Sequence, residues 1–110
     1  MLVIDSDESK AEKVQMEGAK DTFVQILVNH PPAPTFVMRK FRIKPKGHTP
    51  LHAHNYEHEV YVLQGVGEVR DDKQAIPIKP GSVVFVPPNE VHQFKNVGDE
   101  DLVFLCLVPA

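Results

Sequence analysis

Hydrophobic residues along this chain are grouped into short runs rich in Val, Ile, Phe and Tyr. Runs of this length and composition predict β-strands, and the Pro, Gly, Asn and Asp residues between them predict turns. Many short strands at near-even spacing are typical of an antiparallel sandwich or barrel, so we expect an all-β fold. The predicted strands are Thr22–Val28, Phe36–Ile43, Glu59–Leu63, Gly67–Arg70, Ala75–Ile78, Val83–Val86, Val91–Lys95 and Leu102–Val108.

The N-terminal residues 1–21 form a separate arm ahead of a barrel that we expect to span residues 22–110. Ser9–Ala19 has no convincing helical stripe of apolar residues, and Gly18 weakens a helix further, so this segment is predicted as a loop or a short edge strand. Leu2–Ile4 reads as a short apolar strand, which needs an edge to pair with. The edge of a second copy would meet that need and would make a homodimer.

Size, charge and cysteine usage narrow the class of protein. A chain of 110 residues with 42% hydrophobic residues makes one domain with a real core. Its net charge is −3 and its Lys and Arg residues are scattered, so no basic stripe predicts a nucleic-acid partner. The single cysteine forms no internal disulfide, and no stretch reads as a signal peptide or a membrane span. We therefore expect a cytoplasmic protein without a membrane partner.

Histidines provide the candidate chemistry. Of the six, His52, His54 and His58 are separated by even offsets, so an extended backbone would point all three to one face. A lone histidine is usually a surface or satisfied core residue, and we read His30 and His48 as surface residues. Three imidazoles on one face would be costly to bury without a metal, so this cluster predicts a metal site.

Two longer stretches resemble the cupin motifs. Lys46–Gly65, KGHTPLHAHNYEHEVYVLQG, is similar to the first motif, and Gly81–Asn96, GSVVFVPPNEVHQFKN, is similar to the second, which places His92 as a further ligand. The resemblance implies a jelly-roll barrel with little or no helix, one divalent metal per chain, usually manganese or iron, and a homodimer. Lys46 and Asn89 stand where the motifs have glycines, and Asn tolerates a left-handed turn.

The fourth ligand departs from the family pattern, which usually supplies a glutamate seven positions before a glycine. Counting back from Gly65 gives His58, which also shares the parity of His52 and His54. We therefore predict a site of His52, His54, His58 and His92, with Glu59 in place of His58 as the alternative. Small cupins with the string H-x-H-x-x-E-H-E and the ending F-L-C-L-x-P look like a subgroup to which this chain is similar.

A four-histidine site would leave the ion its full charge and, on an octahedral ion, two open positions. These features favour a metal-dependent oxygenase of the dioxygenase class that acts on a small organic substrate. A non-catalytic sensor or storage protein and an isomerase are the alternatives. A closed tetrahedral zinc would be structural, and zinc, nickel and copper also accept imidazole.

The predicted pocket follows from parity and from the resemblance. Val60 and Val62 share the parity of His58, Phe94 shares that of His92, and the resemblance places Phe104 and Cys106 on the metal side. Cys106 either contacts a ligand or is a small buried hydrophobe. Arg39 either meets an anionic substrate at the barrel mouth or is solvated. Glu57 and Glu59 either hydrogen-bond a ligand imidazole or are solvated.

Overall fold

The computed structural model describes all 110 residues and is built almost entirely of β-strands. The only helical element is a single 3₁₀ turn, η1 (Glu8–Lys10). No helix has the length and apolar character of a membrane span. The strands are β1 (Glu12–Lys13), β2 (Lys20–Val28), β3 (Phe36–His48), β4 (His58–Gln64), β5 (Gly67–Arg70), β6 (Ala75–Ile78), β7 (Val83–Val86), β8 (Gln93–Asn96) and β9 (Leu102–Pro109).

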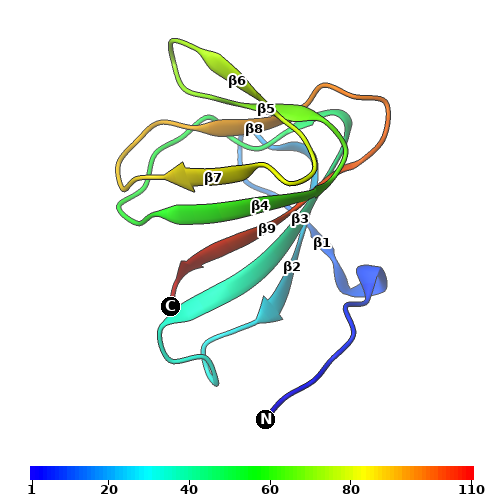
Figure 1. Ribbon diagram of the computed structural model, residues 1–110, viewed down its shortest axis with the longest axis vertical. Coiled ribbons are helices and arrows are strands. Elements are labelled where there is room, and N and C mark those ends of the chain that lie inside the picture. The colour runs from blue at the N-terminus through cyan, green and yellow to red at the C-terminus, as the bar shows by residue number, and fades with distance from the viewer.

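These strands form one strongly curled antiparallel sheet (Figure 1). Its order is β6-β5-β8-β3-β9-β4-β7, with β2 added on β3 and β1 on β2. The long strand β3 is the organiser, because it pairs with β2, with β9 and, through His48, with β8. The predicted all-β barrel is confirmed, and each predicted strand corresponds to an observed one within a few residues.

Strand β3 differs most from expectation, because it continues through Lys44–His48, where a break was predicted. A register shift between the Lys20 and Thr22 pairs absorbs the extra residues of β3 as a bulge. Lys46 has a φ of 69° within this bulge, the left-handed conformation that the glycine of the motif would adopt easily. Asn89 also has a φ of 69°, as its turn position required.

The N-terminal arm contains one edge strand, as expected, but it lies later than Leu2–Ile4. Strand β1 pairs with the outer edge of β2, opposite Phe23 and Val24. Residues 2–4 form no strand within the chain, and Leu2 remains 63% exposed. Glu8 holds the arm to the barrel through Lys40 at 2.6 Å and Arg42 at 3.2 Å.

The core follows from the alternation of the strands. On β4 the side chains of His58, Val60 and Val62 are buried, whereas Glu59 and its alternating neighbours face out. The inward residues pack against those of β3, β8 and β9 in one apolar cluster: Val37, Ile43, Val60, Val62, Ile78, Val86, Phe94, Leu102, Phe104, Cys106 and Val108. The histidines lie beside this core, so the packing of the barrel fixes their backbone.

Candidate metal centre

Four imidazole rings meet on the inner face of the curled sheet. His52 and His54 lie on the segment after β3, His58 is the first residue of β4, and His92 directly precedes β8. The backbones of His52 and His92 form an isolated antiparallel bridge, with N–O distances of 3.1 and 2.9 Å. This bridge holds residues from the two sequence motifs side by side. Their ring centroids are 5.2 Å apart.

His52, His54 and His92 each offer a ring nitrogen within 4.8 Å of the others, which is the arrangement of a metal site. His58 adjoins this group: its Nε2 contacts Nε2 of His54, and its ring centroid is 5.0 Å from that of His92. The structure therefore brings together all four histidines that the sequence predicted. Three of them form the compact ligand group, and His58 stands next to it.

Hydrogen bonds from Nδ1 to backbone carbonyl oxygens orient two of these rings. Nδ1 of His54 lies 2.8 Å from the carbonyl oxygen of Tyr56, and Nδ1 of His92 lies 2.9 Å from that of Glu90. A carbonyl oxygen can only accept, so each Nδ1 carries the proton and donates. The opposite nitrogen, Nε2, is then unprotonated and free to bind a cation. The donor chemistry of the cluster thus fits a transition metal.

Burial favours the neutral form of three of these imidazoles, those of His52, His58 and His92. Desolvation, followed by the nearby charge of Arg39, lowers the pKa of His58 to about 3. Desolvation also lowers the pKa of His52 and of His92 below the ordinary 6.5. Neighbouring histidines add to this effect, and at His92 the hydrogen bond to the backbone of Glu90 opposes it. Neutral imidazole is the form that binds metals, so protons compete weakly for these nitrogens at neutral pH.

Arg39, Cys106 and His58 form a triangle of contacts at the edge of the cluster. Nη2 of Arg39 lies 3.1 Å from Sγ of Cys106 and 3.2 Å from Nδ1 of His58, and that Nδ1 lies 3.0 Å from Sγ. Arginine can only donate. If His58 binds a cation through Nε2, its Nδ1 must keep the proton and donate it to Sγ, which then accepts from both neighbours. Burial raises the pKa of the Cys106 thiol, and Arg39 opposes this effect.

These residues line a cavity of about 210 Å³. Three predicted pocket residues, Arg39, Phe94 and Phe104, are in its wall, as is Cys106. The prediction for Val60 and Val62 needs correction. Both face inward, as parity required, but they are 2% and 0% exposed and fill the core beside the cavity rather than its wall. The full lining is Val14, Met16, Thr22, Val24, Arg39, Phe41, Thr49, Pro50, His52, His54, Tyr56, His58, His92, Phe94, Phe104 and Cys106.

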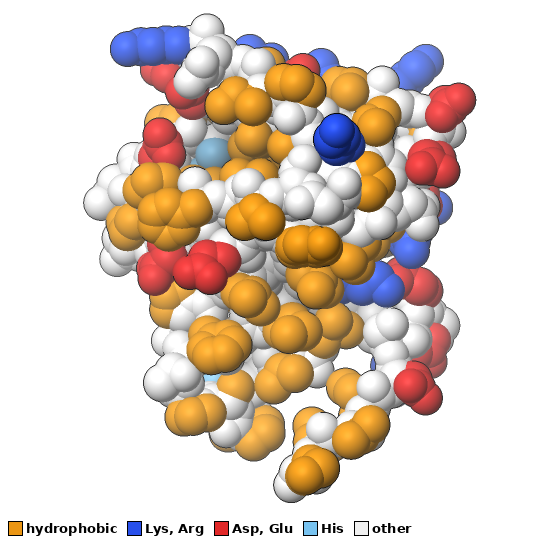
Figure 2. All heavy atoms as spheres, viewed as in Figure 1, with side chains coloured by type: hydrophobic (Ala, Val, Ile, Leu, Met, Phe, Trp, Pro, Cys, Tyr) orange, Lys and Arg blue, Asp and Glu red, His pale blue; other side chains and the backbone are white.

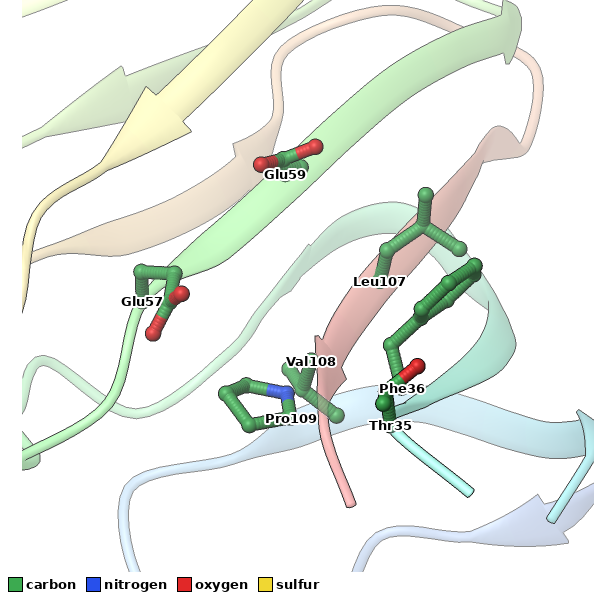
Figure 3. Close-up of a pocket in the computed structure, with 7 residues that line it drawn as sticks. All are labelled: Thr35, Phe36, Glu57, Glu59, Leu107, Val108 and Pro109. Carbon is green, nitrogen blue, oxygen red and sulfur yellow. The ribbon is translucent and has the colours of Figure 1, made fainter. Parts of the chain in front are cut away.

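The two glutamates that flank His58 lie elsewhere. Glu57 and Glu59 line a groove on the outer surface, together with Phe36 at the start of β3 and Leu107 on β9 (Figure 3). Glu59 is exposed, whereas His58 beside it is buried, because successive side chains of a strand point to opposite faces. The outward position of Glu59 favours His58 over Glu59 as the residue that faces the cluster.

Sequence reasoning missed several wall residues. The ring of Tyr56 stacks on that of His54, with centroids 4.0 Å apart and an interplanar angle of 8°. Its even offset from His54 was an available signal. Val14 and Met16 come from the N-terminal arm, and their spacing of two is that of a strand. His48 also differs from the prediction: it is partly buried on β3, with Nδ1 3.3 Å from Gln93, whereas His30 is exposed as expected.

Several known proteins are similar to this chain in structure or in sequence. The polyketide cyclase RemF from Streptomyces resistomycificus superposes with a TM-score of 0.87 at 34% identity, over 98% of this chain and 80% of that one. The 1-methylthio-D-xylulose 5-phosphate methylsulfurylase of Rhodospirillum rubrum is 36% identical over 73 residues, which are 66% of this chain and 47% of that protein. The oxalate-binding protein of Thermotoga maritima is 36% identical over 70 residues, 63% of this chain and 58% of that protein.

These relatives differ in what they bind or transform, and the chain spans only about half the length of the two curated ones. RemF shares the fold of this chain, and the two curated proteins share about a third of the residues over the matched stretch. The cupin domain model matches residues 39–108, a range that contains all four clustered histidines, Arg39 and Cys106. The chain therefore belongs to the cupin family.

Proposed function

We propose that this protein is a metal-dependent enzyme, an oxygenase in class, that acts on a small organic substrate in the cavity beside the histidine cluster. His52, His54, His58 and His92 would hold one divalent ion. When bound, such an ion would supply Lewis acidity and, in the case of manganese or iron, redox chemistry. The observation that carries the proposal is a cluster of imidazoles that opens into a cavity with no carboxylate in its wall.

The wall of the cavity supports this choice over proton-shuttling isomerisation. It contains no Asp, Glu or Lys side chain, and its four histidines are the proposed metal ligands, so no free carboxylate, amine or imidazole is left there as an obvious general base. Phe41, Phe94 and Phe104 give it a largely apolar surface, which binds an organic body and keeps water out. The neutral ligands leave the charge of the ion undiminished. An apolar cavity and an ion with its full charge suit chemistry that depends on an activated metal, and such chemistry needs no proton relay.

The test is elemental analysis followed by oxygen consumption. Protein reconstituted with manganese or iron should contain about one ion per chain and should consume oxygen with a member of a panel of small phenols and enols. Zinc-loaded protein is the control, because zinc has no redox chemistry. Oxygen uptake that is equal with zinc, or absent with every metal and substrate, would contradict the oxygenase. Ligand binding without any turnover would favour the binding-module alternative.

Lewis-acid ring closure is a second candidate, and a specific likeness favours it. RemF, which is a polyketide cyclase, matches 98% of this chain at 34% identity. A cyclisation needs a polarised carbonyl but no oxygen, and zinc would support it as well as iron. Turnover under nitrogen by zinc-loaded protein would favour this function, and a strict requirement for oxygen would argue against it.

We also propose that the protein is a homodimer. The outer face of β4 and β7 presents apolar side chains side by side: Tyr61 and Val83 pair across the two strands and are 50% and 74% exposed, and Phe85 is 60% exposed. Hydrophobic side chains are spread over this side of the molecule in Figure 2. Exposed patches of this kind usually mark an interface. Light scattering should give twice the 12.4 kDa chain mass, and Phe85→Glu should give the monomer. A monomeric wild-type protein would contradict the dimer.

A further inference from the structure

Arg39 is the only permanently charged side chain in the wall of the cavity, and it has no acidic partner. The ion pairs of the chain involve Lys40, Arg42 and Lys44, which lie on the same strand but pair with Glu8 or Asp101. Arg39 instead contacts Cys106, His58 and the face of Phe41, whose ring centroid is 5.0 Å from the guanidinium carbon. Its Nε is buried and has no hydrogen-bond partner.

A guanidinium that is partly buried without a counter-ion is expensive, and part of that cost is recovered when an anion binds. The imidazoles beside it carry no negative charge in either protonation state, so they do not balance the guanidinium. A divalent ion held by them would add to the local positive charge, because no carboxylate stands in the wall. Any negative charge that balances Arg39 within the cavity would therefore have to come from a bound molecule.

The rest of the wall restricts the body of that ligand. Phe41 and Phe104 stack with centroids 5.4 Å apart at an interplanar angle of 15°, and Phe94 lies 4.8 Å from Phe104. Flat aromatic walls favour a flat apolar body. The volume of about 210 Å³ holds about seven water molecules at roughly 30 Å³ each. It is smaller than the pockets of drug-sized ligands, which span about 300–1,000 Å³. A single ring with a short substituent fits these limits.

We propose that the cavity binds a small planar organic anion, a carboxylate or enolate carried on one aromatic or conjugated ring, with the anionic oxygen placed on Arg39. Arg39 is then the residue that sets the substrate class. The guanidinium offers parallel N–H donors that suit a carboxylate or a pair of vicinal oxygens. Contact between this anion and a metal ion rests on the proposed function. Binding of the anion by Arg39 does not rest on it, because the charge and the aromatic wall belong to the chain itself.

The experiment measures binding of benzoate by calorimetry, with benzamide as its neutral counterpart of nearly the same shape. We expect benzoate to bind at least tenfold more tightly than benzamide to wild-type protein, and Arg39→Gln to remove most of that preference. Arg42→Gln is the matched control, because Arg42 lies on the same strand but pairs with Glu8 and Asp101. It should bind benzoate as the wild type does. Oxalate, an anion without an apolar body, should bind less tightly than benzoate.

The binding measurements test the anion site and the aromatic body of the ligand separately. Equal affinity of wild-type protein for benzoate and benzamide would overturn the anion site, and this measurement needs no variant. An Arg39→Gln protein that folds and binds benzoate normally would also overturn it. Oxalate that binds more tightly than benzoate would overturn the aromatic body. The metal content of the same samples separates the two proposals. If the protein holds no metal but still binds benzoate through Arg39, this inference is supported and the proposed function fails.

Discussion

Replacement of His58 by alanine is the sharpest test of the proposed metal centre, because His58 is the proposed ligand that the family pattern would not supply. Its side chain is 7% exposed, it touches His54, and its Nδ1 lies 3.0 Å from Cys106. His52, His54 and His92 form a compact group without it. The variant therefore asks whether the site has three protein ligands or four.

The size of the effect follows from the number of ligands. Binding of zinc to a structural site with four protein ligands is worth about 10–16 kcal/mol, or about 2.5–4 kcal/mol for each ligand if the ligands contribute equally. At about 1.4 kcal/mol for each tenfold change, loss of one ligand weakens binding by roughly 10²–10³-fold. Water that replaces the imidazole moves the result of His58→Ala towards the lower end of this range.

The assay is competition with a fluorescent zinc chelator at pH 7, and two variants serve as controls. Glu59→Ala changes the neighbouring residue on the opposite face of β4, and His48→Ala removes a histidine that lies outside the cluster. Both should keep the wild-type affinity. A His58→Ala protein within about threefold of wild type would refute the four-ligand reasoning and leave a three-histidine site. Loss of affinity in Glu59→Ala would refute the assignment by strand parity.

Three further predictions test contacts around the site and the barrel. Cys106→Ala should weaken metal binding by about 10–100-fold, which is the usual effect of removing a group that orients a ligand imidazole. Cys106→Ser should stay closer to the wild-type affinity, and equal losses in the two variants would contradict an acceptor role for Sγ of Cys106. Glu8→Gln should destabilise the fold at pH 7 by at most about 1 kcal/mol. The hydrogen bonds from Arg42 and then Lys40 lower the pKa of Glu8 from 4.5 to about 2, so its contribution is present above pH 4.5 and disappears as the pH falls through 2. Urea unfolding should therefore show a difference at pH 7 that vanishes near pH 2, and a difference equal at both would count against it. Lys46→Gly should raise the free energy of unfolding by up to about 1 kcal/mol, because Lys46 has a φ of 69°, whereas the control Lys44→Gly should lower it; a destabilised Lys46→Gly protein would contradict this account.

Local patterns were enough to predict most of the fold. Runs of β-branched and aromatic residues have the same preference for extended backbone wherever they occur, so the strands could be located without knowledge of their partners. Parity likewise predicted that His58 faces inward and Glu59 outward, because alternation is a property of any extended segment. The end of β3 could not be predicted in this way. Its continuation to His48 depends on pairing with Lys20 of β2 across a bulge.

The sequence by itself determined the strands, the inward set of histidines and the family, since each depends on residues close together in the chain or on a fixed spacing. Only the tertiary structure decided what surrounds them. Cys106 lies opposite Arg39 because β3 and β9 pair in that register, and this pairing turns a possible surface arginine into a charge inside the cavity. Val14 and Met16 reach the cavity because the arm folds back along β2. Such contacts join residues that are distant in sequence, and no local preference encodes the register that brings them together.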